Sequence, residues 1–432
     1  EIGRAQAVQA EACGLRPVAE HNPILLKPSG GVSQLVLLGQ PGEHIRAGDY
    51  YQHIDRVWEI VRATLEGWHQ RCDVLLLEGA GSPVELNLMH RDIVNLKPML
   101  HLDGRWLLIG DIERGGIFAQ AVGTHTLMPP EAQSRGLGFV VNKFRGDLSL
   151  FGDADRYFAK HLPDLPYLGT LPYRADLQVE SEDSLCEAAE ASGTGAKLAW
   201  LRFPHLSNSQ DSQPWQLDTG IRVDWVRQPA DLANARAIVL PGSKNTIADL
   251  LWLRETGLGD AILQAAAQGI PIVGICGGYQ MLGRSLADPE GVAGAAGTVP
   301  GLGLLPAETV FSDRKTVRQV RATWQGHADW MAYEIHMGRT HALETVEPLL
   351  AIKAVSQNYP EGMQQGAVWG TYLHGLFESG NVRQALTNLA GITDYRCGQE
   401  SWQDRQRQLF DRLADFIDAY LDLTPIREYL DG

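Results

Sequence analysis

The chain has 432 residues, of which 44% are hydrophobic and 21% charged, and these proportions are typical of a globular protein with two or three domains. Its formal net charge is −15 and no basic block stands out, so nucleic acid is a poor partner. No apolar run approaches the roughly 18 residues of a membrane helix, and the first residues lack a secretory signal pattern. Five scattered cysteines without a CxxC pair predict a cytoplasmic protein with no disulfides and no zinc site.

The first half of the chain alternates helical and strand-like segments. A helix is predicted over 52–70, where apolar residues recur on one face. Short apolar runs predict strands within 72–81, 106–116, 137–147 and 165–173. Buried runs without alternation, separated by helices, are typical of a parallel sheet covered on both faces, so we predict an α/β fold.

A small, polar, glycine-containing stretch divides the chain into two α/β series. This predicted linker covers 187–197, and the segments after it are again strand-like and helical, ending in an amphipathic helix. The predicted parts are an N-terminal domain over 1–186, the linker, a second domain over 198–395 and a C-terminal helical extension over 396–432. In the second domain, strands are predicted within 235–246, 271–278 and 371–379. The helix of the extension spans 401–423.

A cysteine lies between glycines at the end of an apolar run. The segment GICGG, 274–278, has the G-x-C-x-G arrangement of a nucleophile elbow, in which a strand turns sharply into a helix and strains the backbone of Cys276. The start of the following helix would favour the thiolate, and the N–H of Gly277 is suited to stabilise an oxyanion. The alternative is a buried core cysteine ahead of a glycine-rich turn.

A cysteine nucleophile needs a base, and His374 is the best candidate among the 13 histidines. It follows a strand-like run and precedes a glycine, and residues just past the carboxyl ends of parallel strands converge on one crevice. The loop 240–246 is a third strand end, where Gly242 could let backbone N–H groups approach a ligand. An ordinary turn is the alternative for that loop.

Two acids end apolar runs in the first half. Glu78 and Asp111 could together hold Mg²⁺ beside nucleotide phosphates, or they could be acidic strand ends that serve solubility. Asn142 and Lys143 follow another apolar run, where they could contact the purine base of a nucleotide.

Four stretches of the second half, GICGGYQMLG, LPGSKNT, YEIHMG and TYLHGLFE, resemble the glutaminase half of the cobyric acid synthase family, a branch of the triad-type glutamine amidotransferases. The resemblance implies a flavodoxin-like class I amidotransferase domain in which Cys276 attacks the side-chain amide of glutamine, His374 transfers protons and Gln280 belongs to the glutamine site. Triad enzymes usually carry Glu two residues after the histidine, where this chain has Leu376. The branch works as a Cys–His pair, which leaves the orienting partner of His374 unidentified. His336, in the YEIHMG stretch, could line the same site or be a buried polar strand end.

Further stretches resemble the synthetase domain of the same family, which is related to dethiobiotin synthetase: EIGRAQAVQA, NPILLKP, EGAGSPVELNL, DIERGGIFA, NKFRGD and LGTLPY. The resemblance covers essentially the whole chain and implies a P-loop-type parallel-sheet domain. There ATP and Mg²⁺ would activate a corrinoid substrate, adenosyl-cobyrinic acid a,c-diamide, and ammonia would amidate four of its side-chain carboxylates. It strengthens Glu78 and Asp111 as metal-binding residues and Asn142 as a nucleotide-binding residue.

The family's glycine-rich phosphate loop, which ends in G-K-[ST], has no counterpart in these residues. The two explanations are a chain that lacks its first residues and a variant that has lost ATP chemistry. In either case we expect poor ATP binding and an uncovered apolar surface. The alternatives to a cobyric acid synthase are a cobyrinic acid a,c-diamide synthase-like amidotransferase and a corrinoid-binding remnant without ATP chemistry.

Overall fold

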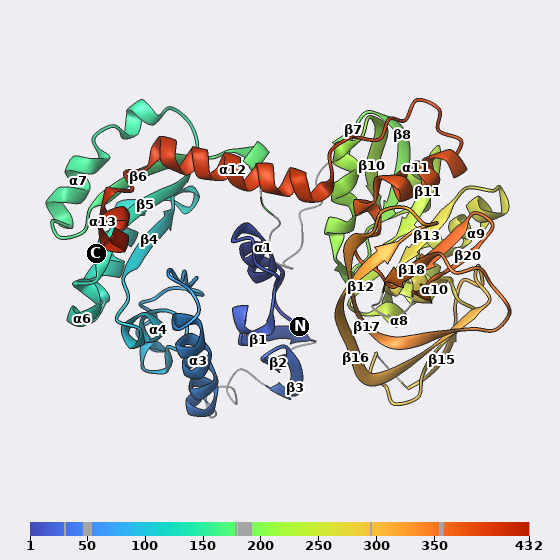
Figure 1. The fold of residues 1–432 in the computed structure, drawn as a ribbon, viewed down its shortest axis with the longest axis horizontal. Helices are drawn as coiled ribbons and strands as arrows, with labels where there is room; N and C mark the ends of the chain where they lie inside the picture. The colour runs from blue at the N-terminus through green and yellow to red at the C-terminus, as the bar shows by residue number, and fades with distance from the viewer. Residues whose placement is uncertain are drawn as a thin grey trace. The chain divides into compact units, whose positions relative to one another are not determined.

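The computed structural model describes residues 1–29, 32–45, 54–177, 179, 192–293, 296–353 and 358–431. The chain divides into two compact units, one formed by Glu1–Glu180 with Arg407–Gly432 and the other by Ser181–Gln406 (Figure 1). Across the described ranges, no helix combines the length and the apolar character needed to cross a bilayer.

A three-stranded parallel sheet forms the centre of the first unit, in the order β4-β5-β6. It confirms three of the predicted strands. Helices α5 and α7 pack on it through an apolar cluster that includes Phe139 and Phe158, both 1% exposed. The elements are β4 (Trp106–Asp111), α5 (Ile117–Leu127), α6 (Pro130–Gln133), β5 (Gly136–Phe144), α7 (Ala154–His161) and β6 (Tyr167–Pro172), with short 3-10 turns at Ile112–Arg114, Leu148–Phe151 and Ala175–Leu177.

The strand predicted within 72–81 is wrong, although the preceding helix, α3 (Ile54–His69), is confirmed. Residues 74–80 have no regular structure and Leu76 is 84% exposed. An apolar run becomes a strand only where a neighbouring strand accepts its ladder of hydrogen bonds. No described strand does so here, and β4, at the edge of the sheet, pairs only with β5.

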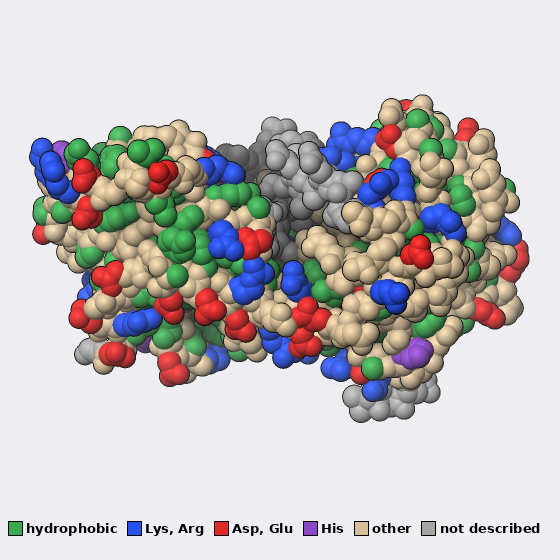
Figure 2. Space-filling model, turned by 90° about the horizontal axis from the view of Figure 1, so that it is seen from above, with side chains coloured by type: hydrophobic (Ala, Val, Ile, Leu, Met, Phe, Trp, Pro, Cys, Tyr) green, Lys and Arg blue, Asp and Glu red, His purple; other side chains and the backbone are tan. Residues whose placement is uncertain are grey.

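The first unit exposes several large apolar side chains. Ile109 on β4 is 63% exposed and Leu150 is 86% exposed, and Figure 2 shows hydrophobic side chains on the upper face of this unit. Its N-terminal part adds an antiparallel meander that the sequence patterns did not indicate. The remaining elements are α1 (Arg4–Ala12), β1 (Ile24–Ser29), β2 (Val32–Leu37), β3 (Gln40–Ile45) and α4 (Leu96–His101), with 3-10 turns at Ala19–His21 and Met89–Arg91.

The C-terminal residues pack with the first unit. The predicted helix within 401–423 is confirmed as α12 (Trp402–Tyr420), and α13 (Thr424–Asp431) follows it. Arg412 pairs with Asp176, and the Asp422 N–H donates to the carbonyl of Leu168 on β6 at 2.7 Å. The apolar residues of α12 stay partly or largely exposed, with Tyr420 at 41%.

The second unit is built around a seven-stranded sheet in the order β20-β21-β13-β11-β8-β10-β7 (Figure 1). Its five central strands are parallel, and in chain order they run 2-1-3-4-5 across the sheet, which confirms the flavodoxin-like prediction. The strands are β7 (Ser192–Gly193), β8 (Gly195–Leu201), β10 (Gly220–Val226), β11 (Ala235–Leu240), β13 (Ile272–Ile275), β20 (Met363–Gln365) and β21 (Val368–Thr371). Of the predicted linker, 187–191 lies outside the described residues, and 192–197 contributes to β7 and β8.

Helices and a second sheet complete this unit. The second sheet has the order β15-β14-β16-β18-β19, with β17 paired to β16, and sequence patterns did not predict it. The helices are α8 (Thr246–Glu255), α9 (Leu258–Ala267), α10 (Gly277–Leu282) and α11 (Gly380–Leu389), with 3-10 turns at Ser209–Leu217 (η7), Pro229–Leu232 and Leu376–Glu378. The further strands are β9 (Leu206–Ser207), β12 (Gly242–Ser243), β14 (Ser285–Asp288), β15 (Gly297–Pro300), β16 (Ala307–Thr323), β17 (Trp330–Ala342), β18 (Leu350–Lys353) and β19 (Tyr359–Glu361).

Candidate active site

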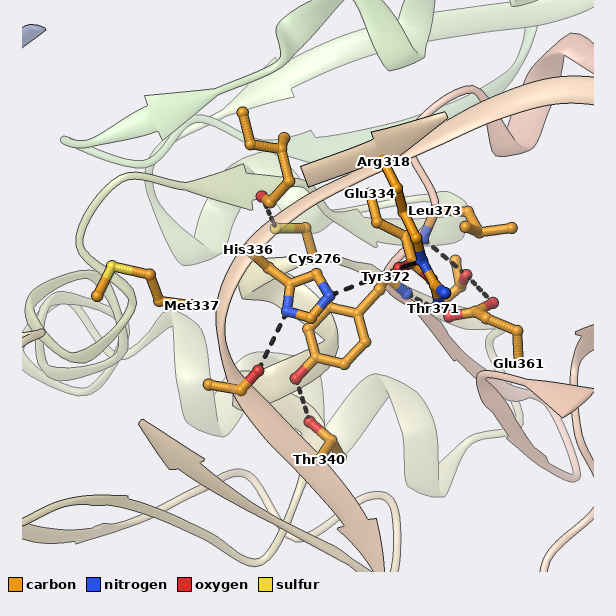
Figure 3. A network of polar contacts seen from close by, with 12 residues as sticks. Cys276, Arg318, Glu334, His336, Met337, Thr340, Glu361, Thr371, Tyr372 and Leu373 are labelled. Atoms are coloured by element: carbon orange, nitrogen blue, oxygen red, sulfur yellow. Dashed lines mark hydrogen bonds and ion pairs between the residues drawn. The ribbon is translucent and has the colours of Figure 1, made fainter. Parts of the chain in front are cut away.

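Cys276 occupies the turn between strand β13 and helix α10, as the sequence predicts. Its backbone angles are φ 52° and ψ −107°, a region that a side chain adopts only under strain. The residue is 6% exposed, and its thiol lies 3.5 Å from the carbonyl oxygen of Ile335 on β17 (Figure 3). The strained turn therefore directs the sulfur away from the sheet and toward β17.

The glycines around Cys276 are required by close backbone contacts. A Cβ on Gly278 would lie 1.9 Å from the carbonyl oxygen of Leu240, and a Cβ on Gly274 would lie 2.7 Å from that of Gly278. At Gly277, a Cβ would lie 2.9 Å from the Ser243 nitrogen. The helix can begin directly after the strand only because these positions carry no side chain.

His374 follows β21 and is fully buried. Its Nδ1 lies 2.7 Å from Oδ2 of Asp211, and the second oxygen of Asp211 accepts the Gly375 N–H at 2.8 Å. Asp211 therefore fixes both the ring and the backbone next to it. It has the contacts of the orienting partner that the sequence left unidentified, and it lies on the 3-10 helix η7, far from His374 in the chain.

The other ring nitrogen of His374 faces Asn208 and Cys276. Nδ2 of Asn208 lies 3.1 Å from Nε2, while Oδ1 of Asn208 accepts hydrogen bonds from Gln210 and Tyr333. These two donors fix the orientation of the Asn208 amide, so its NH₂ group points at Nε2. The neutral ring then carries its proton on Nδ1, toward Asp211, and its Nε2 lone pair accepts from the Asn208 amide, a hydrogen bond that must be given up when Nε2 takes a proton.

The electrostatic surroundings make His374 a stronger base than a free imidazole. Burial lowers the pKa of His374, but the negative charge of Asp211, its hydrogen bond and the contacts with Cys276 outweigh burial and raise the pKa to about 10. The ring of Tyr333 stacks on the imidazole at 5.1 Å and 25°. A basic, clamped imidazole in contact with the sulfur is suited to take the thiol proton.

The structure brings Gly242 to the same place. A Cβ there would lie 3.1 Å from Cε1 of His374, so the loop after β11 approaches the imidazole ring closely. Gly242 and Ser243 form β12, which pairs with β9 just before Asn208. The loops after β8, β11, β13 and β21 thus meet at one edge of the parallel sheet, where such sites are expected.

Gln280 is buried and its amide supports the scaffold around the site. The amide oxygen accepts from Thr246, and the NH₂ group donates to the carbonyl of Met337 at 2.7 Å and lies 3.3 Å from the Tyr372 hydroxyl. These bonds tie α10 to β17 behind Cys276. A contact between Gln280 and glutamine stays a prediction.

His336 takes part in the packing beside Cys276 (Figure 3). Its ring stacks on Tyr372 at 3.6 Å and 16°, and its Nδ1 lies 3.1 Å from the carbonyl of Gly338. The residue therefore has the contacts of a packed polar strand position, and a role in lining the glutamine site stays a prediction.

In the first unit, Asp111 at the end of β4 is the direct neighbour of Asn142, two residues before the end of β5. Asp111 accepts from the backbone of Glu113 at 2.9 Å and from Nζ of Lys143 at 3.0 Å. Burial opposes ionisation of Asp111, but the bond to Lys143 and the backbone bond lower its pKa. Glu78 lies in the irregular segment and accepts from the Gln9 amide. Among the described residues, no group of three or more His, Cys, Asp or Glu side chains is arranged to hold a metal.

Asp211 and Asn208 are candidate site residues that the sequence did not indicate, although a signal was present. Both lie in the loop that follows β8, and β8 is a strand of the same parallel sheet as β13 and β21. Polar residues after each strand of such a sheet are candidates for the same crevice. Extending that rule to the first strand of the second domain would have included both residues.

The fold and this cysteine–histidine–aspartate group define a glutamine amidotransferase domain. Residues 197–382 match the family described as the CobB/CobQ-like glutamine amidotransferase domain. A protein named cobyric acid synthase from Synechocystis sp. is 40% identical over 443 residues, covering 100% of this chain and 88% of the relative. Another with the same name, from Roseiflexus castenholzii, is 39% identical over 443 residues, with 100% and 89% covered. The chain belongs to the cobyric acid synthase family. A solved structure described as a glutamine amidotransferase aligns with 46% of the chain at 20% identity and a TM-score of 0.36.

Proposed function

We propose that the second unit hydrolyses glutamine through Cys276, His374 and Asp211, and that the ammonia serves an ATP-dependent amidation of a corrinoid. The observation that carries the glutaminase proposal is the strained Cys276 turn in contact with a buried histidine that is hydrogen-bonded to a carboxylate. A structural cysteine needs neither the backbone strain nor the paired imidazole.

The proposed reaction begins when Nε2 of His374 takes the thiol proton, and Asp211 stabilises the resulting imidazolium. The sulfur attacks the side-chain amide carbon of glutamine, and the backbone N–H of Gly277 is the oxyanion donor. His374 returns its proton to the leaving nitrogen, so that ammonia departs and a glutamyl thioester remains on Cys276. Water, deprotonated by His374, then hydrolyses the thioester to glutamate.

The residues of the first unit suit a nucleotide in their chemistry. Asp111 and Glu78 offer the carboxylate oxygens that Mg²⁺ prefers, and Lys143 beside Asp111 offers positive charge to a phosphate. We propose that Glu78 and Asp111 hold Mg²⁺ and that Asn142 contacts the base of ATP. Bound MgATP would supply the phosphoryl group that activates a carboxylate, and Lys143 would then leave Asp111 for the phosphate.

The names of the curated relatives support the substrate. We propose that the chain's family reaction is the amidation of four side-chain carboxylates of adenosyl-cobyrinic acid a,c-diamide, with glutamine as the nitrogen donor. Relatives named cobyric acid synthase favour this substrate over the one used by a cobyrinic acid a,c-diamide synthase. The cytoplasmic location predicted from the scattered cysteines stays a prediction.

The experiment compares Cys276→Ala with Cys397→Ser, which changes a half-buried cysteine of the same unit outside the site. Release of glutamate from glutamine should disappear in Cys276→Ala and persist in Cys397→Ser. In a second assay, a corrinoid substrate with glutamine and MgATP should gain amide groups only when Cys276 is intact, and added ammonium should restore amidation in Cys276→Ala. Unchanged glutamate release by Cys276→Ala would remove this cysteine from the mechanism.

A further inference from the structure

A buried carboxylate lies beside the end of β21, the strand that precedes His374. Glu361, at the end of β19, is 8% exposed and accepts two hydrogen bonds from the end of β21. One comes from the hydroxyl of Thr371 and the other from the backbone N–H of Tyr372, at 2.8 Å (Figure 3). The Thr371 hydroxyl in turn accepts the Leu373 N–H at 3.0 Å. Glu361 therefore holds, directly or through one hydroxyl, the three residues that precede His374.

The same residues connect to the nucleophile. Thr371 pairs with Ile275 in the parallel sheet, and its carbonyl accepts the N–H of Cys276 at 2.8 Å. A shift of Thr371 would thus move the backbone of Cys276 and the approach to His374 together. Glu361 lies at the junction between the two catalytic residues without touching either of them.

We infer that Glu361, as a carboxylate, is a positioning residue that sets the relative placement of the Cys276 thiol and the His374 imidazole. This inference rests on the proposed glutaminase function. As a carboxylate, Glu361 can accept both hydrogen bonds at once, one on each oxygen. A protonated carboxyl keeps only one oxygen free of hydrogen, so the bond donated by the Thr371 hydroxyl must be broken or reversed. The restraint on residues 371–373 weakens accordingly.

The charged and titratable groups around Glu361 come from three further elements. Arg318 on β16 donates to Glu334 on β17, with Nε 2.6 Å from Oε2, and both influence Glu361. Tyr279 on α10 and Tyr372, whose backbone N–H donates to Glu361, are neutral neighbours, and the charge of Glu361 raises the pKa of both. Glu334 raises the pKa of Glu361 and Arg318 lowers it, so this ion pair does not by itself decide whether Glu361 is charged.

The charge of Glu361 changes near neutral pH. Burial is the largest cause and raises the pKa, the hydrogen bonds from Thr371 and Tyr372 lower it, and the result is a pKa of about 7. Since the deprotonated form makes both bonds, the restraint is present above this pKa and is lost as the pH falls through it. Glutaminase kcat should therefore rise with pH through about 7, and KM should change little.

The test compares Glu361→Gln with Asp288→Asn in the full chain. Asp288 is a matched control because it is also a buried carboxylate that accepts backbone N–H groups, from Val292 and Ala293, but in the second sheet. Three measurements are made on each protein: kcat and KM for glutamine from about pH 6 to about pH 9, the rate of Cys276 alkylation by iodoacetamide over the same range, and the thermal midpoint.

We expect Glu361→Gln to lower kcat by roughly ten- to a hundredfold, because misplacing reacting groups by about 1 Å costs about that much. Its KM should stay within about twofold of the parent value, and the rise of kcat and of alkylation through pH 7 should vanish. Asp288→Asn should keep both pH profiles. The inference is overturned if kcat and the alkylation rate of Glu361→Gln still rise through pH 7. It is also overturned if both variants lose kcat in the same proportion to the decrease in their thermal midpoints.

The alkylation rate separates this inference from the proposed function, because it requires no glutamine. A parent protein that alkylates at Cys276 with the rise through pH 7, and a Glu361→Gln variant that lacks the rise, supports the positioning role even if glutamine is not hydrolysed. Conversely, a glutaminase whose Cys276 alkylation is the same in both proteins overturns the positioning role and leaves the glutaminase intact.

Discussion

Replacing Asp211 with Asn tests the proposed control of the His374 imidazole by the buried carboxylate. The asparagine oxygen can keep the hydrogen bond from the Gly375 N–H, which now goes to Asp211 at 2.8 Å. The asparagine NH₂ group then faces Nδ1 of His374, 2.7 Å from where the carboxylate oxygen lies. Since an NH₂ group cannot accept a proton from Nδ1, the imidazole must carry its proton on Nε2. That nitrogen can no longer take the proton of Cys276.

The expected loss is large because the pair is almost completely buried. The side chains of His374 and Asp211 are 0% and 1% exposed, so water cannot substitute for the lost charge. The same tautomer change in a hydrolase triad costs about 10⁴-fold in kcat. Four factors of ten correspond to about 5 kcal/mol of transition-state stabilisation. KM for glutamine should change little, because Asp211 acts on the imidazole and does not contact the substrate in the proposed mechanism.

The assay measures glutamate release against glutamine concentration for the parent chain and Asp211→Asn, with circular dichroism to establish that both are folded. Asp288→Asn, which removes a buried carboxylate from the second sheet, controls for the loss of a buried charge. A folded Asp211→Asn variant that keeps more than about a tenth of the parent kcat would refute the role assigned to Asp211.

Three more predictions concern the same unit. Gly278→Ala should destabilise the fold by about 3 kcal/mol or more, because its Cβ would lie 1.9 Å from the Leu240 carbonyl oxygen. A thermal midpoint within a degree or so of the parent value would be inconsistent with that contact. Arg383→Ala should lower the free energy of unfolding, measured in urea, by about 3–5 kcal/mol, because Arg383 and Asp218 form a buried ion pair at 2.7 Å. A decrease below about 1 kcal/mol would show that the pair contributes little. Because the pKa of His374 is raised in the folded protein, its ionised form stabilises the fold. This contribution is fully present below about pH 6.5 and is lost as the pH rises through about 10. A thermal midpoint that does not depend on pH across this window would contradict the prediction.

The strained turn at Cys276 was predictable because its signal is local. Gly274, Gly277 and Gly278 lie next to Cys276 in the chain, and each is needed by a backbone contact within the same turn. His374 was predictable because one rule of parallel sheets brings strand ends together. By contrast, Asp211 lies 163 positions from His374, and its role depends on a loop conformation that no periodic pattern specifies.

The errors in the fold prediction have a similar cause. The run 72–81 has the composition of a buried strand, but strand formation depends on a neighbour, and Leu76 is 84% exposed. The long pair β16 and β17 was missed for the opposite reason. Its strands carry many polar and charged residues, among them Arg318 and Glu334, so no apolar run marks them, although they follow one another in the chain and pair as a hairpin.

Trapping the covalent intermediate tests the central claim most directly. The chain is mixed with glutamine, quenched in acid within the first turnovers, digested and examined by mass spectrometry. The account predicts that the peptide containing Cys276 gains one glutamyl group, held as a thioester that hydroxylamine removes, and that the corresponding peptide of a Cys276→Ala variant does not. Glutamine turnover with no glutamyl group on this peptide, or with the group on another cysteine, would contradict it.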